Sequence, residues 1–145
     1  MTETPLPEAL ADIREEFLSV GEKERLTLLL EFAEELPDLP ERYADHPDLL
    51  ERVEECQAPV FLFTEIIDGI VHLHVTAPKE APTTRGFASI LVQGLEGLTP
   101  AEVLNVPDDY PQTIGLARAI SPLRLRGMSA LLARVKRQVR ERNAA

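Results

Sequence analysis

The sequence of 145 residues predicts an α+β fold, in which a small antiparallel β-sheet is packed by N-terminal and C-terminal helices. Three observations predict this. Apolar residues repeat at helical spacing near the N-terminus, a β-hairpin signal lies in the middle, and helical segments that begin with proline follow it. The length is enough to bury a core as one domain, residues 1–145.

Two helices are predicted first. The apolar residues of the first repeat at helical spacing, and Gly21 is a typical stop signal. These residues are Leu6, Leu10, Ile13, Phe17 and Val20. A second helix is expected from about Glu22 to Leu36, where Pro37 ends it. Its apolar face is expected to contain Leu26, Leu29, Leu30 and Ala33. Residues 38–55 are predicted to be a connector, with one helical turn after Pro47.

The clearest local signal is a hairpin formed by residues 60–67 and 70–76, both rich in Val, Ile and Phe. They flank Asp68-Gly69, the preferred pair for a two-residue type I′ turn. That turn fixes the register, so that Glu65 should face His72 and Phe63 should face His74.

Glu65, His72 and His74 therefore share one face of the hairpin, because alternate residues of a strand point the same way. Such a set is compatible with a metal site. A half-exposed surface with a cross-strand Glu–His pair explains it more simply, and we favour that interpretation.

Helices are predicted again after the hairpin. One should run from about Thr83 to Glu96, with Gly86 and Gly94 marking close backbone approaches. A capping box with proline at the first helical position, Thr99-Pro100-Ala101-Glu102, opens a short helix. Residues 108–112 are expected to be a loop, and residues 113–119 another short helix. The last helix should begin at Ser121-Pro122 and run to about Arg142, with an apolar stripe. This stripe contains Met128, Leu131, Leu132, Val135 and Val139.

Composition excludes several classes of function. The net charge is −10, and residues 1–57 carry 17 acidic against 5 basic side chains. An acidic molecule with no aromatic residues among its C-terminal basic ones is not expected to bind nucleic acid. No apolar run is long enough for a membrane span, and residues 1–7 do not resemble a signal peptide. We expect a cytoplasmic protein, and a single cysteine suits that reducing compartment.

Cys56 is the chain's only cysteine, and it lies between an acidic run and the first predicted strand. A single cysteine rules out an intramolecular disulfide and a site built from cysteines alone. By itself such a residue is more often a small buried hydrophobe than a reactive thiol.

Three segments, in this order, resemble the SufE family of sulfur-acceptor proteins in iron–sulfur cluster assembly. Val53-Glu54-Glu55-Cys56-Gln57-Ala58-Pro59-Val60 is similar to the family's V-x-G-C-Q-S-x-V. Arg85-Gly86-Phe87 and the later Leu98-Thr99-Pro100-Ala101-Glu102-Val103 are similar to its (R/K)-G-(L/F) and T-P motifs. Ile120-Ser121-Pro122-Leu123-Arg124-Leu125-Arg126-Gly127-Met128 is similar to its L-(S/T)-P-S-R-x-x-G-(L/M). The resemblance covers roughly residues 8–140.

The resemblance implies a fold like that of NifU-type scaffold proteins, and it implies a function. Cys56 would correspond to the cysteine that carries a persulfide, and Arg124 to an arginine near it. The protein would stimulate a SufS-type cysteine desulfurase, accept its sulfur and pass it to a SufB-containing scaffold. It would act as a carrier and activator rather than as a stand-alone enzyme. It would need no cofactor of its own, since the pyridoxal phosphate belongs to the desulfurase.

Departures from the family pattern keep other interpretations open. Glu55 replaces a glycine, Ala58 replaces a serine, and Leu123 stands beside Arg124 in place of a polar residue. Negative charge at Glu55 disfavours a thiolate on Cys56. Arg124 would be expected either to offset the charges of Glu54 and Glu55 or to favour the thiolate. The main alternative is an adaptor that binds the desulfurase but transfers no sulfur. A weaker one is a thiol peroxidase, which would require a lowered thiol pKa.

Overall fold

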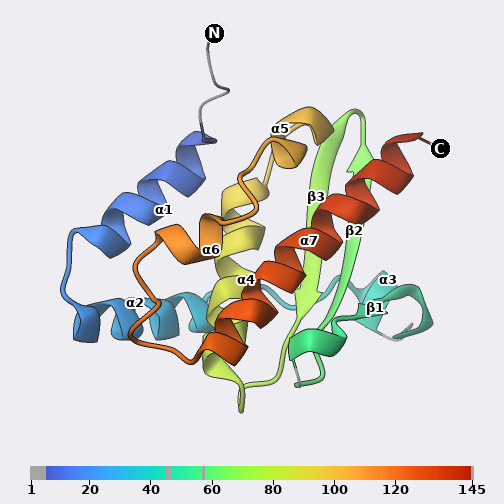
Figure 1. Ribbon diagram of the computed structural model, residues 1–145. Helices are drawn as coiled ribbons and strands as arrows, with labels where there is room; N and C mark the ends of the chain where they lie inside the picture. Colours follow the sequence, from blue (N-terminus) through green and yellow to red (C-terminus); the bar gives the residue numbers. More distant parts are fainter. Residues whose placement is uncertain (1–5, 45–46, 57, 145) are drawn as a thin grey trace, which may run out of the picture.

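The computed structural model describes residues 6–44, 47–56 and 58–144 (Figure 1). Its N-terminal half contains α1 (Glu8–Leu18), α2 (Glu22–Glu34), α3 (Glu41–Ala44), the 3₁₀ turn η1 (Pro47–Leu49), β1 (Glu51–Arg52), the 3₁₀ turn η2 (Glu54–Cys56) and β2 (Phe61–Ile67). The C-terminal half contains β3 (Ile70–Thr76), α4 (Pro82–Leu95), α5 (Pro100–Leu104), α6 (Tyr110–Thr113) and α7 (Pro122–Ala144). The predicted α+β class is confirmed.

The sheet has three antiparallel strands in the order β1-β2-β3. Glu65 is opposite His72 and Phe63 is opposite His74, as the turn chemistry predicts. Asp68 and Gly69 both have positive φ, 52° and 76°, which a type I′ turn requires. The hairpin and its register are therefore confirmed.

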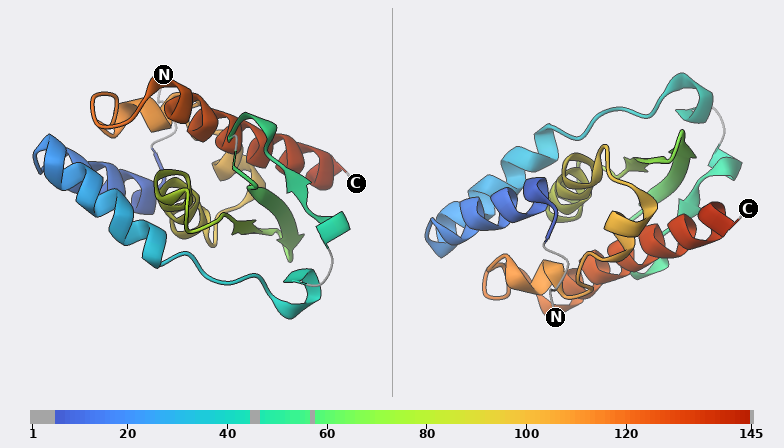
Figure 2. Two further views of the ribbon diagram at one scale, coloured as in Figure 1. Left: turned by 90° about the horizontal axis from the view of Figure 1, so that it is seen from below. Right: turned by 90° about the horizontal axis from the view of Figure 1, so that it is seen from above.

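Helices α4 and α7 pack against one face of the sheet, α4 mainly on β3 and α7 mainly on β2. Helices α1 and α2 contact α4 and lie beyond it, as the two views of Figure 2 show. Leu10 and Phe17 of α1 are fully buried, and Leu6 and Ile13 pack partly buried against the same core. The predicted stripe of α7 is buried throughout.

Two glycines of α4 allow its neighbours to approach closely. A Cβ added to Gly86 would lie 2.9 Å from Leu29 Cδ1 of α2, and one added to Gly94 would lie 2.9 Å from Leu10 Cγ of α1. Real Cβ contacts at that distance are essentially never seen. The predicted close approaches are confirmed, and α4 is the central helix that α1 and α2 contact directly.

Four local predictions are wrong. The connector contains α3 and the short strand β1 as well as the expected turn after Pro47. Residues 110–113, expected to lie mostly in a loop, form the helix α6, and residues 114–119, expected to be helical, form turns. Tyr110 holds α6 in place, because it is fully buried and its hydroxyl donates a hydrogen bond to Leu10 O at 2.8 Å. Leu30 is exposed, and Phe32 takes its place in the core beside Phe17.

Within the ranges described, no helix combines the length and the apolar character that crossing a bilayer requires. The segment considered for a signal peptide falls mostly outside those ranges, at residues 1–5, and so does Gln57 of the cysteine motif.

Candidate functional site

Cys56 is the last residue of η2, the turn between β1 and β2. Both ends of this turn are anchored in the core: Val53 and Val60 are fully buried, and Val53 N–H donates a hydrogen bond to Val60 O at 2.8 Å. Cys56 N–H closes the turn on Val53 O at 3.2 Å. The two valines therefore fix where the cysteine is presented.

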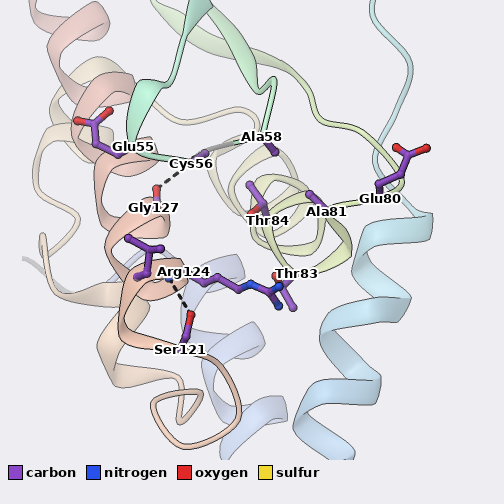
Figure 3. Close-up of a pocket in the computed structure, with 11 residues that line it drawn as sticks. Glu55, Cys56, Ala58, Glu80, Ala81, Thr83, Thr84, Ser121, Arg124 and Gly127 are labelled. Atoms are coloured by element: carbon purple, nitrogen blue, oxygen red, sulfur yellow. Dashed lines mark hydrogen bonds between the residues drawn. The ribbon is translucent and has the colours of Figure 1, made fainter.

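The Cys56 thiol is half-buried against the first turns of α7. Its Sγ lies 3.6 Å from Gly127 O, to which the thiol donates a weak hydrogen bond (Figure 3). Burial raises the pKa of Cys56 to about 11; the negative charge of Glu55 adds to this, and Arg134 opposes it. The thiol is thus protonated at neutral pH in this conformation.

Glu55 is held by α7. Its Oε1 accepts hydrogen bonds from Arg134 Nη2 at 2.5 Å and Nε at 3.2 Å. The Nη1 of the same guanidinium donates to Glu51 Oε2 at 2.6 Å, and Glu51 also contacts Arg137 and Gln138. One arginine therefore joins the cysteine turn and β1 to the last helix.

Glu55 pairs with Arg134 and not with Arg124, so the first of the two roles expected for Arg124 is wrong for this carboxylate. The sequence held a signal for Arg134 that the motif comparison missed. It lies seven residues after Gly127 on the same helix, two turns along the same face, and Gly127 contacts the cysteine.

Arg124 and Cys56 nevertheless line one cavity of about 410 Å³, although they are far apart in the sequence. In Figure 3 the side chain of Arg124 extends across the cavity toward Thr83, at the start of α4. Among the described residues it forms no ion pair. The other lining residues are Glu55, Ala58, Glu80, Ala81, Thr83, Thr84, Ser121, Leu123 and Gly127.

Arg85 of the Arg-Gly-Phe motif fixes the wall of the cavity opposite Cys56. Its Nε donates a hydrogen bond to Ala33 O at 2.9 Å and its Nη1 donates one to Ala77 O at 2.6 Å. These bonds tie the segment between β3 and α4 to the end of α2. The motif residue is thus a structural link in this chain, which spacing alone did not indicate.

The hairpin face with Glu65 and the two histidines is a network without a metal-binding geometry. Glu65 Oε1 accepts from Arg42 Nη2 at 2.6 Å and contacts His74 Nε2 at 2.7 Å, whereas His72 Nδ1 turns to Glu96 at 3.1 Å. No group of three potential ligands is close enough for a metal among residues 6–44, 47–56 and 58–144. A Glu–His pair is present, but Glu65 contacts His74 and not His72, the residue that stands opposite it in the sheet.

Partial burial raises the pKa of Glu65, but hydrogen bonds from Tyr43, Arg42 and His74 outweigh this and lower it to about 2. Tyr43 also packs against Phe63, with ring centroids 4.9 Å apart and ring planes tilted by 35°. The network holds α3 on the outer face of the hairpin.

Comparisons with known proteins agree with this fold. The model of the family described as "SufE: Fe-S metabolism associated domain" matches residues 11–139. An uncharacterised SufE-like protein of Mycobacterium tuberculosis is 53% identical over 137 residues, which cover 94% of each chain. One from Synechocystis is 29% identical over 128 residues, covering 88% of this chain and 77% of that one.

A solved structure shows the same fold. The solution structure of a hypothetical protein from Thermus thermophilus is 39% identical, with a TM-score of 0.85, and covers 97% of this chain and 100% of that one. The α+β fold is thus shared with this relative. The chain belongs to the SufE family, and it is associated with iron–sulfur metabolism through that family.

Proposed function

We propose that this protein accepts sulfur from a SufS-type cysteine desulfurase onto Cys56 and carries it as a persulfide to a SufB-containing iron–sulfur scaffold. In the accepting step, Cys56 Sγ attacks the outer sulfur of the desulfurase persulfide, and the desulfurase cysteine leaves as a thiol. The sulfur–sulfur bond broken is replaced by the one formed, so no oxidant or reductant is needed. The pyridoxal phosphate remains in the desulfurase.

The observation that supports this proposal is the position of the only cysteine, on a three-residue turn at the rim of an open cavity. A chain with no second cysteine cannot resolve a persulfide into an intramolecular disulfide, which would release the sulfur. A persulfide on Cys56 would stay bound until another thiol reaches it.

Because the Cys56 thiol is protonated in this conformation, the desulfurase would have to make it reactive. A thiolate is the attacking species, and burial is the largest cause of the raised pKa of Cys56. A desulfurase that draws the turn away from Gly127 would remove that burial and restore reactivity. The carrier would then be unreactive while free and reactive only when bound.

The adaptor function is a second candidate, and the same thiol favours it. A cysteine whose pKa is raised to about 11 is a poor nucleophile if the turn stays in place on binding. In that case the protein would stimulate the desulfurase through contact alone. The raised pKa argues against a peroxidase, which depends on a thiolate at rest.

Incubation with a SufS-type desulfurase and cysteine, followed by mass spectrometry of the intact protein, tests the proposal. We expect a mass gain of one sulfur atom, reversed by a thiol reductant and absent from Cys56→Ala. The variant should still bind the desulfurase but should no longer raise its turnover. Full stimulation by Cys56→Ala would establish the adaptor function instead.

A further inference from the structure

The cavity beside Cys56 lies between the first turns of two long helices. α4 has 14 residues and α7 has 23, and Thr83 and Thr84 of one and Arg124 of the other line the cavity. The N–H groups of a first helical turn have no intrahelical acceptor and carry the positive end of the helix dipole. Ala81, at the N-cap of α4, supplies no side-chain acceptor. The uncapped start of α4 and the Arg124 guanidinium therefore favour an anion here. At the start of α7, Ser121 Oγ already accepts a hydrogen bond from Arg124 N–H.

Two largely buried threonines also line this space. Thr83 is 6% exposed and Thr84 is 9% exposed, and both line the cavity. Neither side chain makes a hydrogen bond with another described residue. Both hydroxyl groups are therefore free to bond a ligand oxygen in the cavity.

The acidic residues of the cavity do not cancel this preference. Glu55 is paired with Arg134, and the carboxylate of Glu80 points outward in Figure 3, away from Arg124. The cavity thus has two chemically different ends. Arg124 and Thr83 form the end that attracts an anion, and Cys56 lies at the other.

We propose that this cavity binds a small thiol that carries a carboxylate. Its carboxylate would lie at Arg124 and Thr83, and its sulfur would reach Cys56. The volume of about 410 Å³ lies within the range of small-molecule pockets, roughly 300–1,000 Å³. The inference rests on the proposed function, because such a thiol would take the sulfur that Cys56 carries.

The transfer is balanced without a further reactant. The sulfur of the bound thiol attacks the outer sulfur of the Cys56 persulfide, and one new sulfur–sulfur bond forms. The bond between that outer sulfur and Sγ breaks, its electron pair stays on Sγ, and Sγ takes up the proton that the incoming thiol loses. The products are a small-molecule persulfide and the Cys56 thiol.

Alkylation of Cys56 tests the anion site without any sulfur transfer. Iodoacetate and iodoacetamide have nearly the same shape and react at the same sulfur, but only iodoacetate carries a carboxylate. The measured quantity is the ratio of their two rate constants, followed by intact mass. We expect the ratio to fall about tenfold in Arg124→Gln, the effect of losing one charged hydrogen bond. A smaller fall is expected in Thr83→Val.

Arg126→Gln is the matched control, since Arg126 is exposed on the same helix and does not line the cavity. It removes the same charge and should leave the ratio within about twofold of wild type. Equal ratios in Arg124→Gln and wild type would overturn the proposal. So would an equal fall in both arginine variants, which would reveal long-range attraction without a site.

A second experiment concerns the transfer itself. Protein loaded by a desulfurase and freed of cysteine is treated with 3-mercaptopropionate or with its methyl ester, and loss of the added sulfur is followed. We expect the acid to react faster than the ester on wild type and to lose that advantage on Arg124→Gln. A loaded protein with no preference for the acid overturns the thiol site and leaves the carrier function intact. If no sulfur is loaded, the carrier function fails, and the alkylation ratio alone decides whether the anion site exists.

Discussion

The reactivity of Cys56 should respond in opposite directions when either of its two charged neighbours is removed. Its pKa is raised from 9.0 to about 11. At pH 8 a shift of that size lowers the thiolate fraction about 100-fold. The intrinsic nucleophilicity of a thiolate rises with its pKa, and this raises the exchange rate again by about tenfold. Exchange with a neutral disulfide at pH 8 should therefore be about tenfold slower in the folded protein than in the unfolded chain.

Two variants distinguish the effect of neighbouring charges on the pKa of Cys56 from the effect of burial. Glu55→Gln removes a negative charge that raises the pKa of Cys56, so the midpoint of the pH–rate profile should move below that of wild type. Arg134→Gln removes the positive charge that opposes it and should move the midpoint upward. Neither should restore a value of 9.0, because burial is the largest cause and remains in both. Glu54→Gln, a change at an exposed neighbour, serves as the control.

The measurement is the release of thiopyridone from 4,4′-dithiodipyridine between pH 7 and 11, within the range where the fold persists. Acceleration of both variants to the same extent would refute the charge argument. It would mean that the ion pair between Glu55 and Arg134 matters because it keeps the turn in place, and that breaking it exposes the thiol.

Three further predictions concern stability, which urea or thermal unfolding measures. Cys56→Ala should lower the free energy of unfolding by no more than about 1–2 kcal/mol, because one half-buried sulfur and one weak hydrogen bond are lost; a larger loss would make the cysteine structural. Gly94→Ala should lower the free energy of unfolding by more than about 1 kcal/mol, because the added Cβ meets Leu10 Cγ at 2.9 Å. Gly127→Ala is the control and should be tolerated, since its nearest contacts lie at 3.5 Å. Equal losses of stability in the two variants would contradict the packing around Gly94. The lowered pKa of Glu65 contributes stability that is present above its ordinary value of 4.5 and is lost as the pH falls toward about 2; Glu65→Gln should weaken this dependence, and an unchanged profile would count against the network.

The hairpin was predictable in detail because its determinants are local. The pair Asp68-Gly69 specifies the turn, the turn specifies the register, and the alternation of apolar residues specifies the buried face. The helix starts at Thr99 and Ser121 were predictable for the same reason. In each, the capping hydroxyl accepts a hydrogen bond from an N–H group three residues away.

The parts that were missed depend on contacts between distant segments. The helix α6 exists where a buried tyrosine reaches α1, 100 residues earlier. β1 has only two residues, too few for any alternation to show. The partner of Glu55 lies 79 residues away, and only its spacing from Gly127 on the last helix pointed to it. Motif comparison placed Cys56 and Arg124 in one region, but only the structure shows that they line one cavity.

The two walls of the cavity are held in place by very different contacts. On the α4 side, Arg85 bonds two backbone carbonyls, and Gly86 lets the helix lie directly against Leu29. On the cysteine side, the tip of the turn rests on one ion pair at the surface and one long hydrogen bond from sulfur. The wall formed by α4 is therefore held by more contacts than the tip of the cysteine turn. A partner that displaces the tip of this turn would change the surroundings of Cys56 while Thr83 and Thr84 keep their positions.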